Sequence, residues 1–491
     1  MNPLLYEVNT RCWLRALSDR LGTAITLATV PDSELAAWQK LGFTHIWLMG
    51  AWTTGPGARA EALKVPALRR AYDQVLPGWQ EADVAGSPYA IAAYEVPPVW
   101  GGEAGLAAFR RRLRERGLKL LLDFVPNHLG LDHPWIAERP ELFVQSPGQV
   151  PGTFPRHAGG RVRWLAHGKD PYFAPWTDTV QLDYRRATTR AAMTELLASI
   201  AARCDGVRCD MAMLLLNEVF AKTWERFEVA AAPPISEFWT AAIDTVRQTH
   251  PEFLFLAEAY WGLEGRLQAL GFNYTYDKTL YDSLVHRDAV GVQRHLLGLP
   301  AGQVAAGAHF LENHDEPRIA SLLSLPEHRA AALLILGLPG MRFLHEGQLG
   351  GERTQLPVQL SRRAESPQAD IQRLYEQLLT TLPGTAVGQG TGQLCQPRAA
   401  WADNPTSQTF IVVQWQRQPP EFDLVVVNLA PHRSQCYASL TLPHLAEHNW
   451  LMKDLLGSEQ YKRSGDDLQT QGLYLDLPAH GAQLFHFEPV S

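Results

Sequence analysis

The sequence is short of cysteine, of long hydrophobic runs and of excess positive charge, and each shortage excludes a class of protein. Its five cysteines are odd in number and none stands in a Cys-x-x-Cys spacing, which disfavours a disulfide framework and a zinc site. No run of about 18 apolar residues is present, so no membrane-spanning helix is predicted. Lys and Arg number 44 against 51 Asp and Glu, and the net charge of −7 disfavours a nucleic-acid partner.

The N-terminal residues lack a basic segment followed by an apolar stretch and a cleavage site of small residues. Because scattered cysteines are typical of a reducing compartment, we expect a cytoplasmic protein that does not bind a membrane. What the sequence does have is an ordinary globular composition, with 46% hydrophobic and 19% charged residues in a chain of 491 residues. That length accommodates one large barrel and a smaller second domain.

Short apolar runs alternate with helical patterns over most of the chain, which is typical of repeated βα units. Helical periodicity is clear at residues 103–117, 187–204 and 236–250. Eight strands are expected, and their continuous apolar character suits a parallel sheet covered on both faces. These expected strands are residues 44–50, 89–96, 118–125, 206–210, 253–259, 273–277, 306–313 and 341–347. The pattern predicts an α/β fold of the (β/α)₈ TIM-barrel class.

Two segments depart from this rhythm. Residues 129–182, after the third expected strand, are rich in Pro, Gly, Trp and His, which predicts a long inserted loop or small subdomain. After about residue 393, alternating apolar residues and turn signals predict an antiparallel β-sandwich domain. We therefore expect a catalytic barrel at 1–128 and 183–392, an insertion at 129–182 and a C-terminal domain at 393–491.

Four polar motifs stand at or just beyond the ends of expected strands: DFVPNH (123–128), GVRCD (206–210), FLFLAE (253–258) and FLENHD (310–315). In a barrel the carboxyl ends of the strands form the active face, so these motifs are expected to converge there. Each motif alone also has a structural interpretation. Arg208 and Asp210 could form a structural ion pair, and a histidine could be a satisfied core residue.

Taken together, in this order, the four motifs resemble the α-amylase superfamily, glycoside hydrolase family 13, over nearly the whole chain. The resemblance implies that Asp210 is the nucleophile, that Glu258 is the general acid/base, and that Asp315 holds sugar hydroxyls. It also implies supporting roles at five further positions: Arg208 orients the nucleophile, His128 and His314 bind the sugar, Tyr89 stacks beneath it, and Asp123 is structural.

The chemistry of double displacement agrees with these roles. Such a mechanism needs two carboxyl groups about 5–5.5 Å apart, one ionised and one protonated at the working pH. Arg208 is expected to lower the pKa of the nearby Asp210. Glu258 follows the apolar run FLFLA, so burial is expected to raise its pKa.

The chain departs from the family pattern at the positions that usually hold calcium. Gln181, in TVQLDYR, stands where a ligating Asp is usual, and Leu214 stands where a His carbonyl contributes. Calcium requires several hard oxygen ligands, so we expect no calcium and no other cofactor. Met213 replaces a lysine of the acceptor side. An apolar Met-Leu surface there would favour an unusual acceptor, although simple packing of Leu214 against the barrel is the stronger interpretation.

Three functions follow from these observations. The first is a retaining α-glycoside hydrolase that acts on α-glucans or malto-oligosaccharides through a covalent glycosyl-enzyme intermediate. The second is an α-glucan transglycosylase, or an enzyme that isomerises maltose and trehalose, on the same scaffold. The third is a catalytically dead carbohydrate-binding barrel, which the presence of all three carboxylates disfavours. The expected partner is a carbohydrate.

Overall fold

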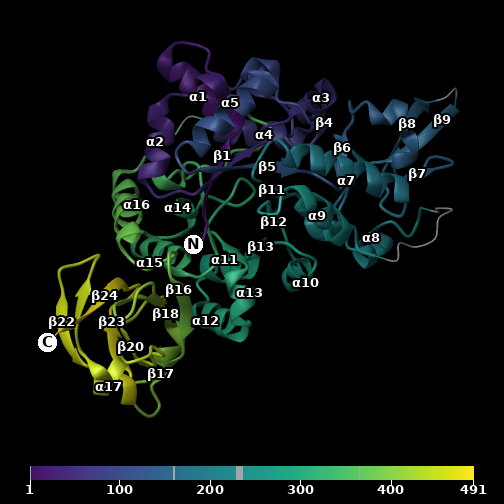
Figure 1. The fold of residues 1–491 in the computed structure, drawn as a ribbon. Coiled ribbons are helices and arrows are strands. Elements are labelled where there is room, and N and C mark those ends of the chain that lie inside the picture. The colour runs from purple at the N-terminus through teal and green to yellow at the C-terminus, as the bar shows by residue number, and fades with distance from the viewer. Residues whose placement is uncertain (1, 159–160, 228–235, 364, 491) are drawn as a thin grey trace.

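The computed structural model describes residues 2–158, 161–227, 236–363 and 365–490. Eight parallel strands close into a barrel in chain order, because β1 pairs with both β2 and the last strand, β15. The predicted (β/α)₈ barrel is therefore confirmed (Figure 1). The barrel strands are β1 (Leu4–Asn9), β2 (His45–Met49), β5 (Lys119–Phe124), β11 (Gly206–Cys209), β12 (Leu254–Ala257), β13 (Tyr274–Tyr276), β14 (Gly307–His309) and β15 (Met341–His345).

One of the eight predicted barrel strands is wrong. Residues 89–96 do not enter the barrel. They contain β4 (Ile91–Ala93), which pairs with β3 (Thr53–Thr54) in a small sheet beyond β2. The missing barrel strand is β1, whose sequence LLYEVN is interrupted by the fully buried Glu7 and ends at Asn9, the N-cap of α1. A strand that contains a buried polar residue lacks the continuous apolar run that is typical of a barrel strand.

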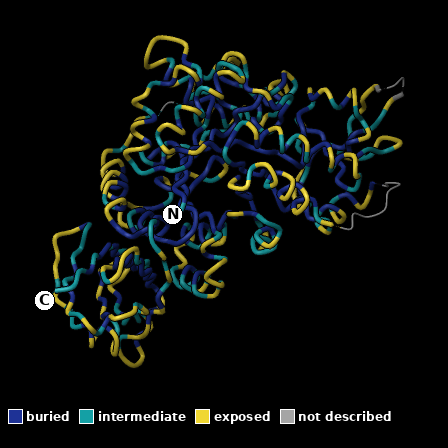
Figure 2. The backbone as a smooth tube through the Cα atoms, in the orientation of Figure 1, coloured by how far each residue is buried: buried dark blue, intermediate teal, exposed yellow. Residues whose placement is uncertain are grey.

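Helices surround the barrel, and Figure 2 shows their outer faces exposed around a buried centre. The helices predicted at 103–117, 187–204 and 236–250 are confirmed, with ends shifted by up to three residues. The helices of the barrel and its loops are α1 (Thr10–Leu21), α2 (Asp32–Lys40), α3 (Pro56–Lys64), α4 (Pro66–Val75), α5 (Gly102–Arg114), α7 (Ala187–Ala201), α8 (Asn217–Thr223), α9 (Phe238–Thr249), α10 (Glu264–Ala269), α11 (Lys278–Val285), α12 (Ala289–Gly298), α13 (Ala301–Ala305), α14 (Ile319–Leu322), α15 (Leu325–Gly337) and α16 (Ala369–Thr381).

Side chains in alternating positions fill the barrel interior. Leu5, Leu256, Tyr276 and Phe343 belong to one buried cluster inside the ring of strands. Because side chains on a strand alternate between its faces, the residue two positions after Leu5 points inward as well. That residue is Glu7, so β1 places a buried acid above the apolar layer, towards the carboxyl end of the barrel.

The segment after the third barrel strand forms an inserted subdomain. It begins with β6 (His128–Gly130), which pairs antiparallel with β10 (Thr179–Gln181) so that His128 lies opposite Gln181. Between them, β7 (Gln145–Ser146), β8 (Thr153–Ala158) and β9 (Arg161–Ala166) form a three-stranded sheet. Figure 1 shows this sheet at the right, away from the C-terminal domain.

The C-terminal part consists of two antiparallel sheets around their own hydrophobic core, in agreement with the predicted β-sandwich. One sheet has the order β16 (Thr391–Cys395), β18 (Phe410–Gln416), β19 (Phe422–Asn428), β24 (Ala482–Val490), β21 (Asn449–Asp454) and β22 (Gln460–Ser464). The other has the order β17 (Pro397–Ala399), β20 (Ser434–Ala438) and β23 (Leu473–Leu477), and α17 (Gly465–Thr470) precedes β23.

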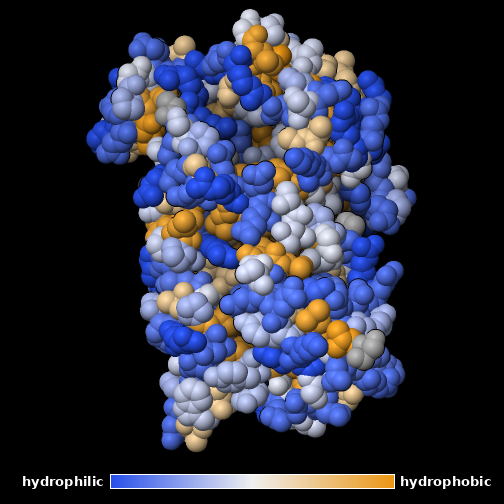
Figure 3. Space-filling model, turned by 90° about the vertical axis from the view of Figure 1, so that its left-hand side faces the viewer, coloured by the Kyte–Doolittle hydropathy of each residue, from blue (hydrophilic) through white to orange (hydrophobic). Residues whose placement is uncertain are grey.

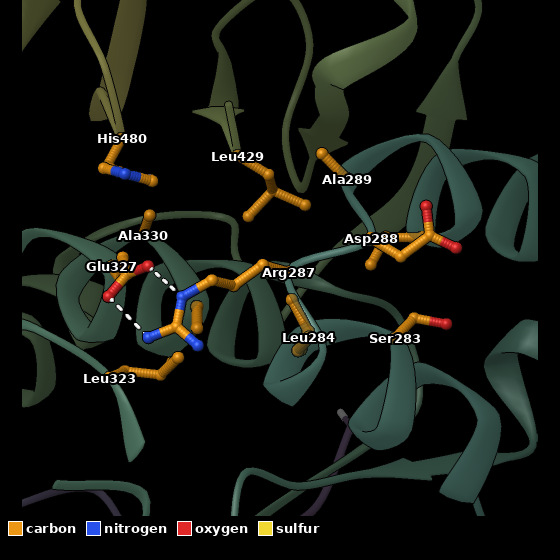
Figure 4. A pocket seen from close by; sticks show the side chains of 12 residues that line it. Ser283, Leu284, Arg287, Asp288, Ala289, Leu323, Glu327, Ala330, Leu429 and His480 are labelled. Atoms are coloured by element: carbon orange, nitrogen blue, oxygen red, sulfur yellow. Dashed lines mark hydrogen bonds and ion pairs between the residues drawn. The ribbon is translucent and has the colours of Figure 1, made fainter. Parts of the chain in front are cut away.

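The C-terminal domain packs directly on the barrel helices. Trp415 on β18 donates its indole N–H to the carbonyl of Gly337 at the end of α15, 2.8 Å away. A small pocket lies at this junction, and in it Arg287 forms an ion pair with Glu327 (Figure 4). On the side of the molecule seen in Figure 3, hydrophobic residues form scattered patches among hydrophilic ones. No helix in the described part of the chain is both long and apolar enough to cross a membrane.

Candidate active site

The carboxyl ends of neighbouring barrel strands bring the three predicted catalytic carboxylates to one face. Asp210 directly follows β11, Glu258 directly follows β12, and Asp315 lies in the loop after β14. Asp210 and Glu258 are buried, with 8% and 3% of their side chains exposed, whereas 46% of the Asp315 side chain is exposed. Two carboxylates therefore lie at the bottom of the site and the third lies at its rim.

Arg208 joins the two buried carboxylates. Its Nη1 lies 2.6 Å from Oδ1 of Asp210, and its Nη2 lies 2.7 Å from Oε2 of Glu258. The guanidinium is fully buried, and its carbon lies 5.3 Å from the ring centres of both Trp47 and Tyr89. A buried cation held by aromatic faces fixes the position of both acids.

Glu258 is held by two further donors. The backbone N–H of Met211 donates to Oε2 at 2.7 Å, and the hydroxyl of Tyr260 donates to Oε1 at 2.8 Å. Met211 adopts a φ of 42°, a left-handed conformation that is costly for a residue with a side chain. That backbone turn directs the Met211 N–H at the carboxylate. Burial nevertheless raises the pKa of Glu258 to about 7, as the sequence analysis predicted.

Asp210 differs from the sequence-based expectation in the direction of its pKa shift. Burial raises the pKa of Asp210 above its usual value, and the neighbouring Arg208 only opposes that rise. Arg208 does lower the pKa of Asp210, as predicted, but burial has the larger effect, and the strand sequence did not reveal how completely this side chain is removed from water. The charge-assisted hydrogen bond from Arg208 still favours the ionised form of Asp210.

His314 links Asp315 to the barrel interior. Its Nε2 lies 3.1 Å from Oδ2 of Asp315 and 2.7 Å from the hydroxyl of Tyr89, and the Tyr89 ring stacks on the imidazole. Its Nδ1 bonds to Glu7 on β1. Partial burial would raise the pKa of Asp315, but the adjacent His314 lowers it to about 2. Asp315 is therefore ionised at neutral pH.

The two remaining predicted residues lie beside this cluster. Asp123 is buried and accepts hydrogen bonds from the Trp47 indole at 3.1 Å and the Gly50 N–H at 2.7 Å, as expected of a structural residue. His128 is buried on β6 against Trp176, and burial lowers its pKa to about 4. His128 is therefore neutral at pH 7, and among the described residues it forms no hydrogen bond to the three carboxylates.

Sequence reasoning missed several residues that complete the site. Glu7 contacts His314, Tyr260 contacts Glu258, and the hydroxyl of Tyr276 lies 3.3 Å from Nε of Arg208. A tyrosine two residues after the acid was a usable signal, because it shares a short loop with Glu258. Glu7 gave no usable signal, since its strand was not recognised.

Met213 and Leu214 do not line the site. Both are buried, with 0% and 2% exposure, and pack in the main hydrophobic core. The suggestion of an apolar acceptor surface is therefore wrong. The alternative given for Leu214, simple packing, is what the structure shows.

At the position usual for calcium in the family, the side-chain amide of Gln181 donates hydrogen bonds to the oxygens that would bind a cation. Nε2 of Gln181 lies 2.8 Å from the carbonyl oxygen of Asn127, 3.0 Å from its Oδ1 and 3.0 Å from the carbonyl oxygen of Leu182. An N–H donor directed at these oxygens competes with a cation, so the donor set does not fit calcium. No group of three or more His, Cys, Asp or Glu side chains suited to a metal occurs among the residues described.

Comparison with known proteins agrees with this geometry. The family model for the alpha-amylase catalytic domain matches residues 33–378. Alpha-amylase MalA of Haloarcula japonica is 26% identical over 267 residues, which is 53% of this chain and 36% of that protein. Alpha-amylase 3 of Dictyoglomus thermophilum is 21% identical over 413 residues, covering 79% of this chain and 73% of that protein. The chain thus aligns with only about a third of the first of these relatives.

Solved structures show the same fold over the full length. The maltogenic alpha-amylase AmyB from Thermotoga neapolitana superimposes with a TM-score of 0.67 at 18% identity, covering 100% of this chain and 99% of that one. A match of the family model to more than two thirds of the chain, together with the barrel and its converging motifs, leads to one conclusion: the chain belongs to the alpha-amylase family of glycoside hydrolases.

Proposed function

We propose that the protein is a retaining α-glycoside hydrolase that acts on α-glucans or malto-oligosaccharides. The observation that carries this proposal is the bridge made by Arg208, which holds Asp210 and Glu258 on its two terminal nitrogens. Retention of configuration requires two carboxyl groups close together, one to attack and one to give and take a proton.

In the first step, a carboxylate oxygen of Asp210 attacks the anomeric carbon and the bond from that carbon to the glycosidic oxygen breaks. Glu258 gives its proton to the departing oxygen, and its raised pKa of about 7 keeps that proton available near neutrality. The product of this step is a glycosyl ester of Asp210 and a shortened sugar with a free hydroxyl.

In the second step, Glu258 is ionised and takes a proton from water as the water oxygen attacks the anomeric carbon. The ester bond breaks and Asp210 leaves as a carboxylate. His314 and Asp315 contribute a donor and an acceptor for sugar hydroxyls at the rim of the site. The negative charge of the carboxylates stabilises the oxocarbenium-like transition state in both steps.

A sugar hydroxyl in place of water would make the same enzyme a transglycosylase. Hydrolysis is the better-supported proposal, because the residues expected to form a special acceptor surface, Met213 and Leu214, are buried in the core. We also propose that no calcium is needed, since Gln181 bonds to the oxygens that would bind it. A cytoplasmic location is proposed on the five free and buried cysteines.

The experiment that tests the function is a proton NMR time course with maltoheptaose and, separately, with maltose. Reducing ends that first appear as the α-anomer would support a retaining hydrolase. First appearance as the β-anomer would exclude retention. New oligosaccharides or trehalose without a net gain of reducing ends would replace hydrolysis by transfer, and no reaction with either sugar would exclude linear α-1,4-glucans as substrates.

A further inference from the structure

Glu7 is a fully buried carboxylate that the proposed reaction steps do not use. It lies on β1, one layer above Leu5, and its register neighbours are Trp47 on β2 and His345 on β15. An ionised side chain is costly to bury unless a partner compensates for its charge. The contacts of Glu7 therefore indicate why a barrel strand carries an acid at this position.

The partner of Glu7 is His314. Oε1 of Glu7 bonds to Nδ1 of the imidazole, and Oε2 has no hydrogen-bond partner among the described residues. The other ring nitrogen, Nε2, lies 3.1 Å from Oδ2 of the half-exposed Asp315 and 2.7 Å from the Tyr89 hydroxyl. His314 thus has one nitrogen bound to the barrel interior and the other at the rim of the site.

We propose that Glu7 is a positioning residue for the reaction, which orients the ring of His314 and keeps both of its nitrogens protonated. With Nδ1–H donated to Glu7, Nε2 presents an N–H to Asp315 and to a sugar hydroxyl. A neutral imidazole would instead have one nitrogen without a proton, and Nε2 would lose its role as a donor whenever the proton stayed on Nδ1. This inference rests on the proposed function for its effect on rate.

The charges around His314 support a protonated ring. Burial alone would lower the pKa of His314, but Asp315 and Glu7 together raise it well above its usual value. Further titratable groups around the ring are the acids Asp123 and Asp210, the Tyr89 hydroxyl and His345. The Arg208 guanidinium packs on the Trp47 and Tyr89 rings that contact His314, and it is already paired with Asp210 and Glu258. Burial and Arg318 lower the pKa of His345 well below its usual value, so this residue adds no competing positive charge.

Two substitutions at Glu7 separate the effect of its negative charge from the effect of its hydrogen-bond acceptor. Glu7→Gln is nearly isosteric and keeps an oxygen that can accept from Nδ1, but it removes the negative charge. Glu7→Leu removes the acceptor as well. We expect Glu7→Gln to lower the pKa of His314 by about one unit or more. We also expect kcat on maltoheptaose to fall about tenfold to a hundredfold with a smaller change in KM, and Glu7→Leu to lose more.

The His314 pKa is read from histidine NMR signals during a pH titration, and the His314→Gln variant identifies the signal by its absence. Asp277→Asn is the matched control, because Asp277 is another buried acid that binds two histidines, His295 and His309, away from the catalytic carboxylates. That control should lower Tm and leave the His314 titration and kcat unchanged.

The combination of Glu7→Gln with His314→Gln gives a second readout. If Glu7 acts only through His314, the double variant has the kcat of His314→Gln alone. A further loss of kcat, or a folded Glu7→Gln protein with an unchanged His314 titration and unchanged kcat, would overturn the inference. If Glu7→Gln does not fold, Glu7→Asp replaces it: the shorter acid should keep His314 charged yet lower kcat, and full activity would overturn the inference.

These outcomes are distinguishable from failure of the proposed function. If the wild-type protein cleaved no α-glucan, the function would fail. The NMR titration would still decide whether Glu7 keeps His314 protonated.

Discussion

Gln181 donates its side-chain N–H groups to both the carbonyl oxygen and the side-chain oxygen of Asn127, at 2.8 and 3.0 Å. The two residues lie on different segments, because Asn127 follows the third barrel strand and Gln181 ends β10 at the return from the insertion. Gln181 is also the register partner of His128. One buried amide therefore fastens the inserted subdomain to the barrel beside the substrate-binding face.

The first prediction concerns metal removal. Because an amide nitrogen bonds to the oxygens that would bind calcium, treatment with EDTA is expected to leave Tm and activity unchanged in a thermal melt and a standard assay. A drop in Tm of several degrees that added calcium restores would show that a structural cation is present and would contradict the proposal.

The second prediction concerns the amide itself. Gln181→Ala leaves Oδ1 of Asn127 and the carbonyl oxygen of Leu182 without their donor, so the free energy of unfolding should fall by about 1–3 kcal/mol. Gln372→Ala is the control, since Gln372 is exposed on α16 and should change stability by less than about 0.5 kcal/mol. Equal stability of the two variants in urea unfolding would show that the amide does not fasten the insertion.

The third prediction concerns the nucleophile. Asp210→Asn should lower kcat on the order of 10⁴-fold or more while Tm stays nearly unchanged. Asp210→Ala with added azide should form a β-glycosyl azide, because the small anion attacks from the side that the carboxylate normally occupies. Asp370→Asn, a change at an exposed carboxylate, is the control and should keep wild-type kcat. Wild-type rates in Asp210→Asn would remove the assignment.

The fourth prediction concerns pH. Glu258 must carry a proton to assist departure of the glycosidic oxygen, and its pKa of about 7 is raised by burial. The value of kcat/KM for maltoheptaose should therefore fall as pH rises through about 7, by about tenfold per unit well above it. An α-glucosyl fluoride, whose leaving group needs no proton, should keep its rate of enzyme glycosylation above that pH. Parallel profiles for both substrates would contradict Glu258 as the acid.

Whether a residue of this site could be predicted from the sequence depends on its position relative to the strands that the sequence reveals. The shared face of Asp210, Glu258 and Asp315 could be predicted because each follows an apolar strand, and parallel strands bring such positions together, whereas their roles were implied by the family resemblance. The bridge from Arg208 to Glu258 could not be predicted, because it depends on the stagger of β11 and β12 in the closed barrel. Glu7 could not be predicted for a related reason: it interrupts the apolar run of its strand, and only the three-dimensional fold places His314 against it.

The last prediction concerns Gly50, which connects the barrel interior to Tyr89. Gly50 has a φ of 70°, its N–H donates to Asp123 at 2.7 Å, and a Cβ at this position would lie 2.7 Å from Cβ of Pro88. Gly50→Ala therefore combines backbone strain with a steric clash, whereas Gly22→Ala, at a φ of 65° with open space around it, has the strain alone.

We expect Gly22→Ala to destabilise the fold by about 1 kcal/mol with unchanged kcat, and Gly50→Ala to destabilise it by about 2–4 kcal/mol. Relief of the clash must move Pro88, and the next residue is Tyr89, whose hydroxyl lies 2.7 Å from Nε2 of His314. A lower kcat in the folded fraction of Gly50→Ala, measured together with Tm, is therefore the expected result. If both variants lost the same stability and kept full kcat, Tyr89 would not depend on this contact for its place in the site.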